Sequence, residues 1–78
     1  MENVEKYDLA FTKNFNIEST QLPQLKYQDI SEWDSIGHMQ LMSSLEESFG
    51  IELDIDDIVE FSSYEAGKVI MKKYQVTI

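Results

Sequence analysis

The chain has 78 residues, of which 15 are acidic and 6 are basic, so its formal net charge is −9. This length fits one domain over residues 1–78 with a small core that buries about 60 to 65% of the surface of the unfolded chain. The charge disfavours contact with nucleic acid or anionic lipid and favours partners that present Lys and Arg.

The start of the chain and its residue types exclude further classes. Met1-Glu2-Asn3 does not begin a basic, apolar signal sequence, and no apolar run approaches the roughly 18 residues that a membrane span needs. We therefore expect a monomeric, cytoplasmic protein. The chain has no cysteine, so it has neither a disulfide framework nor a thiolate site, and any thiol chemistry must come from an added group.

Apolar residues at helical spacing predict a first helix over about residues 3–14. They are Val4, Tyr7, Phe11 and Phe15. Over residues 16–34 the pattern fails, because Ser, Thr and Pro interrupt it. A connector of this length is unusual in a small domain, and we expect apolar side chains to anchor it. The candidate anchors are Leu22, Leu25, Ile30 and Trp33.

A second helix is predicted from Ser35 to Phe49, where Gly50 suits the left-handed residue that often ends a helix. At about 100° per residue, one side of this helix is expected to pack in the core. That side contains His38, Leu41, Met42, Leu45 and Phe49. The other positions are Ile36, Met39, Gln40, Ser43, Glu46 and Glu47. Two of them, Ile36 and Met39, are apolar although they lie off the core stripe.

The remaining residues predict one short and one longer helix. Residues 56–60 form a short helical turn, and Ser62-Ser63 supply a cap for a last helix that ends at Lys72-Lys73. One face of this last helix carries Tyr64, Gly67, Ile70, Met71 and Tyr74. The predicted fold is all-α: a small bundle of three main helices plus one short helix, with a long connector before the serine-bearing helix.

One string of residues resembles a known family. Asp34-Ser35-Ile36 is followed at fixed spacing by Leu41, Leu45, Glu46-Glu47 and Phe49-Gly50-Ile51. This pattern resembles the acyl carrier proteins, which are phosphopantetheine-dependent carriers, and the resemblance covers nearly the whole chain.

The resemblance implies a non-catalytic protein with a covalent 4'-phosphopantetheine arm on Ser35, whose thiol holds acyl groups as thioesters. Asp34 would assist the loading of this arm. The implied partners are a phosphopantetheinyl transferase and acyl-activating, acyl-transferring or condensing enzymes with basic surfaces. In the family, the partner-binding side of this helix corresponds here to Ile36, Met39, Gln40, Glu46 and Glu47.

Some positions differ from the pattern usual in carriers of primary fatty-acid synthesis. Those carriers place a small residue before the aspartate, Leu after the serine and acids early in the helix; here the residues are Trp33, Ile36, Gly37 and Gln40. A specialised biosynthetic pathway is therefore expected first, and fatty-acid synthesis second. Two alternatives stay open: an aminoacyl or peptidyl carrier, and a small acidic helical interaction module without a prosthetic group, in which Ser35 only caps the helix.

Two other clusters favour neither catalysis nor a dedicated metal site. His38 follows Ser35 by three residues, but a Ser-His pair also needs an orienting acid and an oxyanion site. We expect His38 to be partly buried and hydrogen-bonded to the connector, and Trp33 to pack in the connector or core. The acids around Asp54 do not fit an EF-hand loop, because Val59 occupies the required glycine position.

Overall fold

The computed structural model describes residues 2–78. Met1, which is one of the residues used to predict that the chain has no signal sequence, lies outside the described residues. The elements in chain order are α1 (Asn3–Phe15), the 3-10 helix η1 (Ser19–Gln21), α2 (Ser35–Phe49), α3 (Ile55–Glu60) and α4 (Tyr64–Lys72). This confirms the predicted all-α bundle of three main helices and one short one. None of the helices over residues 2–78 is long and apolar enough to cross a membrane.

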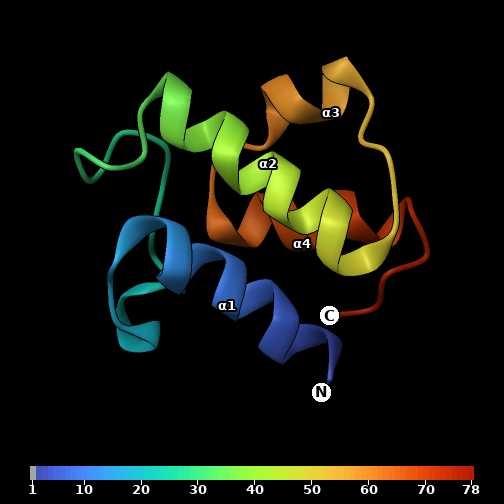
Figure 1. Ribbon diagram of the computed structural model, residues 1–78, viewed down its shortest axis with the longest axis horizontal. Helices are drawn as coiled ribbons and strands as arrows, with labels where there is room; N and C mark the ends of the chain where they lie inside the picture. Colours follow the sequence, from blue (N-terminus) through green and yellow to red (C-terminus); the bar gives the residue numbers. More distant parts are fainter. Residues whose placement is uncertain (1) are drawn as a thin grey trace.

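The helices α1, α3 and α4 surround α2 (Figure 1). In that view α1 lies below α2, α4 lies behind it, and the short α3 lies above it. The two ends of the chain come together at one edge, where Asn3 Nδ2 donates a hydrogen bond to the carbonyl of Thr77 over 3.2 Å. At the far end of α2, Gly50 adopts a left-handed conformation with φ of 62°, as predicted.

The core contains most of the predicted apolar stripes. On α2 the side chains of Leu41, Met42 and Leu45 are buried, whereas Phe49 and His38 are only partly buried. The buried residues of α1 are Tyr7, Ala10, Phe11 and Phe15. Val4 of the predicted stripe remains exposed, because the first turn of α1 lies at the edge of the bundle. Of the predicted face of the last helix, Tyr64, Gly67, Ile70 and Met71 are buried, and Tyr74 follows the helix and is partly buried.

The long connector is pinned to this core at several points. Of its predicted anchors, Leu22, Leu25 and Trp33 are buried and Ile30 is partly buried. The Trp33 ring stacks on Phe15 with a centroid distance of 5.3 Å and an interplanar angle of 26°. An antiparallel bridge pairs Lys26 with Ser63, the N-cap residue of α4. The connector therefore holds the start of α2 in a defined place relative to α1 and α4.

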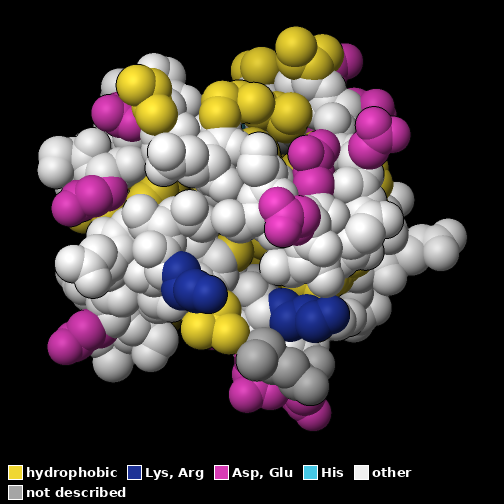
Figure 2. Space-filling view, in the orientation of Figure 1, with side chains coloured by type: hydrophobic (Ala, Val, Ile, Leu, Met, Phe, Trp, Pro, Cys, Tyr) yellow, Lys and Arg dark blue, Asp and Glu magenta, His cyan; other side chains and the backbone are white. Residues whose placement is uncertain are grey.

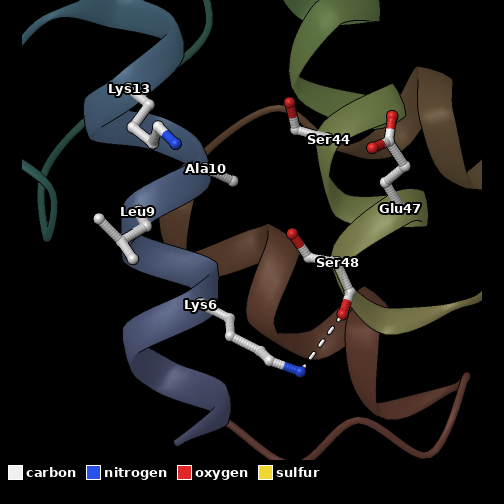
Figure 3. A pocket seen from close by; sticks show the side chains of 7 residues that line it. All are labelled: Lys6, Leu9, Ala10, Lys13, Ser44, Glu47 and Ser48. Atoms are coloured by element: carbon white, nitrogen blue, oxygen red, sulfur yellow. Dashed lines mark hydrogen bonds between the residues drawn. The ribbon is translucent and has the colours of Figure 1, made fainter. Parts of the chain in front are cut away.

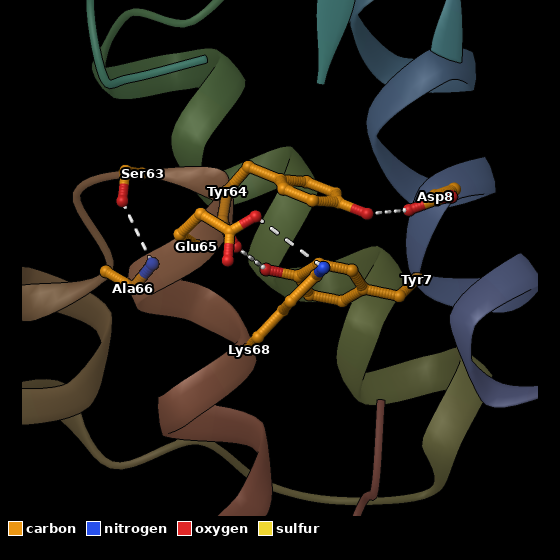
Figure 4. A network of polar contacts seen from close by, with 7 residues as sticks. All are labelled: Tyr7, Asp8, Ser63, Tyr64, Glu65, Ala66 and Lys68. Carbon is orange, nitrogen blue, oxygen red and sulfur yellow. Dashed lines mark hydrogen bonds and ion pairs between the residues drawn. The ribbon is translucent and has the colours of Figure 1, made fainter. Parts of the chain in front are cut away.

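A polar network joins α1 to α4 (Figure 4). The Tyr7 hydroxyl donates to the carbonyl of Tyr64 over 2.7 Å, and the Tyr64 hydroxyl donates to Asp8 Oδ1 over 2.5 Å. Burial raises the pKa of Tyr7, so its hydroxyl stays protonated and remains a donor. Ser63 Oγ accepts a hydrogen bond from the Ala66 amide over 2.9 Å, which confirms the predicted serine cap.

Candidate functional site

Asp34 and Ser35 begin α2 with different structural roles. Asp34 is the N-cap residue, and its Oδ1 accepts a hydrogen bond from the Gly37 amide over 2.8 Å. Ser35 is the first residue within the helix, and its side chain is exposed. The interpretation of Ser35 as the cap is therefore wrong, because the extended backbone of Asp34 brings the carboxylate, and not the serine hydroxyl, to the free amides.

Gly37 allows the connector to approach the first turn of α2. A Cβ atom at this position would lie 1.9 Å from the carbonyl oxygen of Glu32, far inside any real contact. Glycine is the one residue without a Cβ atom, so the backbone of Glu32 can pass close to the helix only here. The glycine therefore determines the path of the connector just before Asp34 and Ser35.

His38 joins three parts of the site. Its Nδ1 accepts a hydrogen bond from Trp33 Nε1 over 2.9 Å, which confirms the predicted bond to the connector. Its Nε2 lies 2.7 Å from the carbonyl oxygen of Ile58 in α3, a contact that the sequence did not predict. Because an indole N–H can only donate and a carbonyl can only accept, the imidazole is neutral and carries its proton on Nε2. With both nitrogens engaged, His38 does not act as a base for Ser35.

An apolar pocket of about 410 Å³ opens beside Ser35, between α2 and α3. Its lining residues are Tyr27, Ser35, His38, Met39, Ile55, Ile58, Val59, Phe61 and Ser62. Hydrophobic side chains gather on this part of the surface, over α3 and the beginning of α2 (Figure 2). Sequence reasoning missed Ile55 and Val59, although two apolar residues four positions apart in an acidic segment were a signal for an apolar edge.

The predicted partner-binding residues fall into two groups. Ile36, Met39 and Gln40 lie together beside Ser35 and line a shallow depression. The side chains of Ile36 and Met39 are 69% and 50% exposed. Both apolar residues therefore stand at the surface next to the serine.

The second group, Glu46 and Glu47, lies farther along α2. Glu46 is partly buried, and its Oε2 accepts a hydrogen bond from the amide of Leu53 over 2.8 Å, so it also fixes the segment after the helix. Glu47 is exposed on a groove of about 410 Å³ between α1 and α2 (Figure 3). The Nζ of Lys6 donates to the carbonyl of Ser48 across this groove over 3.3 Å. Ser35 does not line this groove.

The acidic residues around α3 do not gather into a metal site: among residues 2–78, no group of three potential ligands could hold a metal ion. One of these acids, Asp57, is buried. It accepts hydrogen bonds from Lys73 Nζ over 2.6 Å and from the Tyr74 hydroxyl over 2.5 Å. The bond from Lys73 lowers the pKa of Asp57, and the bond from Tyr74 acts in the same direction. Asp57 therefore ties α3 to the end of α4.

Comparison with known proteins identifies the chemistry of this region. Residues 29–66 match the family model of the phosphopantetheine attachment site, and this segment contains Asp34, Ser35 and the whole of α2 and α3. Residues 29–66 therefore form a phosphopantetheine attachment site. This confirms the resemblance to the acyl carrier protein family and sets aside the interaction module without a prosthetic group. A search of curated proteins and a search of solved structures gave no match.

The start of α2 in this carrier fits the prosthetic group. An exposed serine hydroxyl can form a phosphodiester, and the amides and dipole at the start of a 15-residue helix favour a phosphate. The apolar pocket beside the serine can receive an apolar chain. When bound, phosphopantetheine supplies the thiol that this cysteine-free carrier lacks.

Proposed function

We propose that the protein is an acyl carrier whose 4'-phosphopantetheine arm is attached to Ser35, within a single carrier domain over residues 1–78. The observation that supports this most directly is the exposed position of Ser35 at the start of α2, while Asp34 supplies the cap. The serine hydroxyl is thus available for reaction without loss of the helix cap. The carrier itself performs no catalysis.

Asp34 has a second role in this proposal. One of its oxygens, Oδ1, accepts the bond from the Gly37 amide. A carboxylate has a second oxygen with its own lone pairs. We infer that this oxygen assists loading, when a phosphopantetheinyl transferase places the phosphate on Ser35.

The pocket favours an acyl cargo over an aminoacyl or peptidyl one. Most of its lining residues are apolar, and none of them is a carboxylate or a lysine that could pair with a charged cargo. An α-ammonium group in this pocket would therefore lose its hydration without a charged partner. We place the carrier in a specialised biosynthetic pathway of the cytoplasm, with fatty-acid synthesis second, since Trp33, Ile36, Gly37 and Gln40 depart from the usual pattern of fatty-acid carriers.

The proposed partner surface combines apolar residues beside Ser35 with acids farther along α2. It consists of Ile36, Met39, Gln40, Glu46 and Glu47. The apolar members are exposed beside the serine, where a partner must close over the arm. The net charge of −9 favours acyl-activating, acyl-transferring or condensing enzymes with basic surfaces.

The attachment site is tested by loading with coenzyme A and a broad-specificity phosphopantetheinyl transferase. We expect the wild-type protein to gain the mass of one phosphopantetheine group, and peptide mapping to place this mass on Ser35. Ser35→Ala should gain nothing. Ser48→Ala, which changes an exposed serine at the other end of α2, should load like the wild type. Loading of the Ser35→Ala variant would refute the assignment.

A further inference from the structure

The short helix α3 has few apolar contacts of its own. It spans six residues, and isolated helices of this length are unstable in water. Of its three apolar side chains, Ile55 and Val59 are 77% and 76% exposed, and only Ile58 packs against the core. The position of α3 therefore depends on polar contacts with the rest of the chain. On the side of α4, Asp57 supplies such contacts through its hydrogen bonds with Lys73 and Tyr74.

On the side of α2, the polar contact comes from His38. Its Nε2 donates to the carbonyl of Ile58 over 2.7 Å. This carbonyl belongs to the last turn of α3, where carbonyl groups have no partner farther along the helix. His38 thus satisfies the end of α3 from a neighbouring helix.

The orientation of the imidazole is fixed by its surroundings. Trp33 Nε1 donates to Nδ1 over 2.9 Å, and the indole lies nearly parallel to the imidazole, at an interplanar angle of 17°. Tyr27 and Phe61 present their rings edge-on, with centroids 5.4 and 6.1 Å from that of His38. Since Trp33 is buried, this arrangement leaves one tautomer and one direction for the Nε2–H group.

We propose that His38 is a positioning residue: through Ile58 it holds α3 at the separation from α2 that forms the pocket beside Ser35. Loss of this hydrogen bond lets α3 move away from α2 and changes the pocket, while the rest of the bundle stays folded. This inference deepens the proposed function, because the pocket is the place next to the attachment site where an apolar cargo would lie.

Two substitutions separate the two bonds of His38. The amide of glutamine reaches the position of Nε2, so His38→Gln keeps a donor for Ile58 and loses the acceptor for Trp33. The shorter asparagine reaches the position of Nδ1, so His38→Asn keeps the acceptor and loses the donor. Each variant loses one hydrogen bond, so a general loss of stability should appear in both variants. A specific effect on α3 should appear only in His38→Asn, because only this variant loses the bond to Ile58.

The readout is amide hydrogen exchange of the unmodified protein, compared helix by helix. We expect His38→Asn to speed the exchange of α3 about three- to tenfold relative to α2 and α4, in line with the loss of one hydrogen bond. His38→Gln should leave this ratio near the wild-type value. Equal acceleration of all helices in His38→Asn, or the same α3 ratio in both variants, would overturn the proposal.

A measurement on the wild-type protein keeps the test decisive if a variant fails to fold. Nitrogen-15 NMR of the imidazole should show a neutral ring protonated on Nε2, and protonation on Nδ1 instead would overturn the assignment. The role in the pocket is tested on protein that carries the arm and a saturated acyl chain. Hydroxylamine should cleave the thioester of this chain faster in His38→Asn than in His38→Gln. Equal cleavage rates would contradict that role. Failure to load Ser35 would refute the proposed function and leave the exchange result intact.

Discussion

The close approach of Glu32 to Gly37 makes Gly37→Ala a sharp test of how the start of α2 is built. Helix propensity alone predicts that this change stabilises the protein by up to about 1 kcal/mol. The structure predicts the opposite. An alanine Cβ would lie 1.9 Å from the Glu32 oxygen and 3.1 Å from its carbonyl carbon, whereas real Cβ contacts essentially never come under 3.0 Å.

The expected magnitude follows from the type of atom involved. The oxygen belongs to the backbone, so it cannot rotate away as a flexible side chain would, and the connector must shift by roughly 1 Å. Overpacking costs about 1 to 3 kcal/mol, and a clash with backbone falls in the upper part of this range, about 2 to 3 kcal/mol; the gain in helix propensity offsets about 1 kcal/mol of it. We therefore expect a net loss of about 1 to 2 kcal/mol, a substantial part of the stability of a small domain.

Urea unfolding followed by far-UV circular dichroism measures this loss. Ser43→Ala is the matched control, because it places alanine at an exposed position of the same helix, and it should change stability by no more than about 0.5 kcal/mol. A shift of the connector should also slow phosphopantetheine loading, since Asp34 moves with it. A Gly37→Ala variant as stable as the wild type would show that the Glu32 carbonyl does not press on the helix.

Three further predictions concern the faces and charges of the bundle. Leu45→Ala, at a fully buried position, should lower the free energy of unfolding by about 2 to 5 kcal/mol, whereas Met39→Ala should change it by about 0.5 kcal/mol or less; equal losses would contradict the two faces of α2. The hydrogen bond from Lys73 lowers the pKa of Asp57 below its usual 3.8, so this pair stabilises the fold fully above pH 3.8; the stability deficit of Asp57→Asn should shrink as the pH falls below 3.8 and vanish once the pH is below the lowered pKa of the folded protein. In pH-dependent urea unfolding, a deficit in Asp57→Asn that persists in acid would refute the role of the pair. Because the net charge is −9, added salt should raise the melting temperature and weaken binding to a basic partner enzyme; a melting temperature indifferent to salt would contradict this self-repulsion.

The main helices could be predicted because their signals are local. Apolar residues repeat at helical spacing through α1 and α2, and Gly50 marks the end of α2, so the sequence places both helices within a residue or two. The cap could not be assigned in the same way. Asp34 and Ser35 are both good capping residues, and the backbone angles of one residue decide between them.

Contacts that depend on the position of α3 could not be predicted. His38 and Ile58 are 20 residues apart, and their bond exists only because α3 folds over the start of α2. The burial of Asp57 was also hidden in the sequence, where it stands among other acids without a nearby base. It meets Lys73 and Tyr74 only when the end of α4 packs against α3.

The separate roles of Asp34 and Ser35 have a consequence for the life cycle of the carrier. If the arm is joined to Ser35, its addition and removal leave the helix cap in place, so the bare and the armed chain share one folded structure of similar stability. The bare chain would then be folded and ready for loading by the transferase. Enzymes that must act on the armed form alone would have to recognise the arm itself, because the surface of α2 is the same in both.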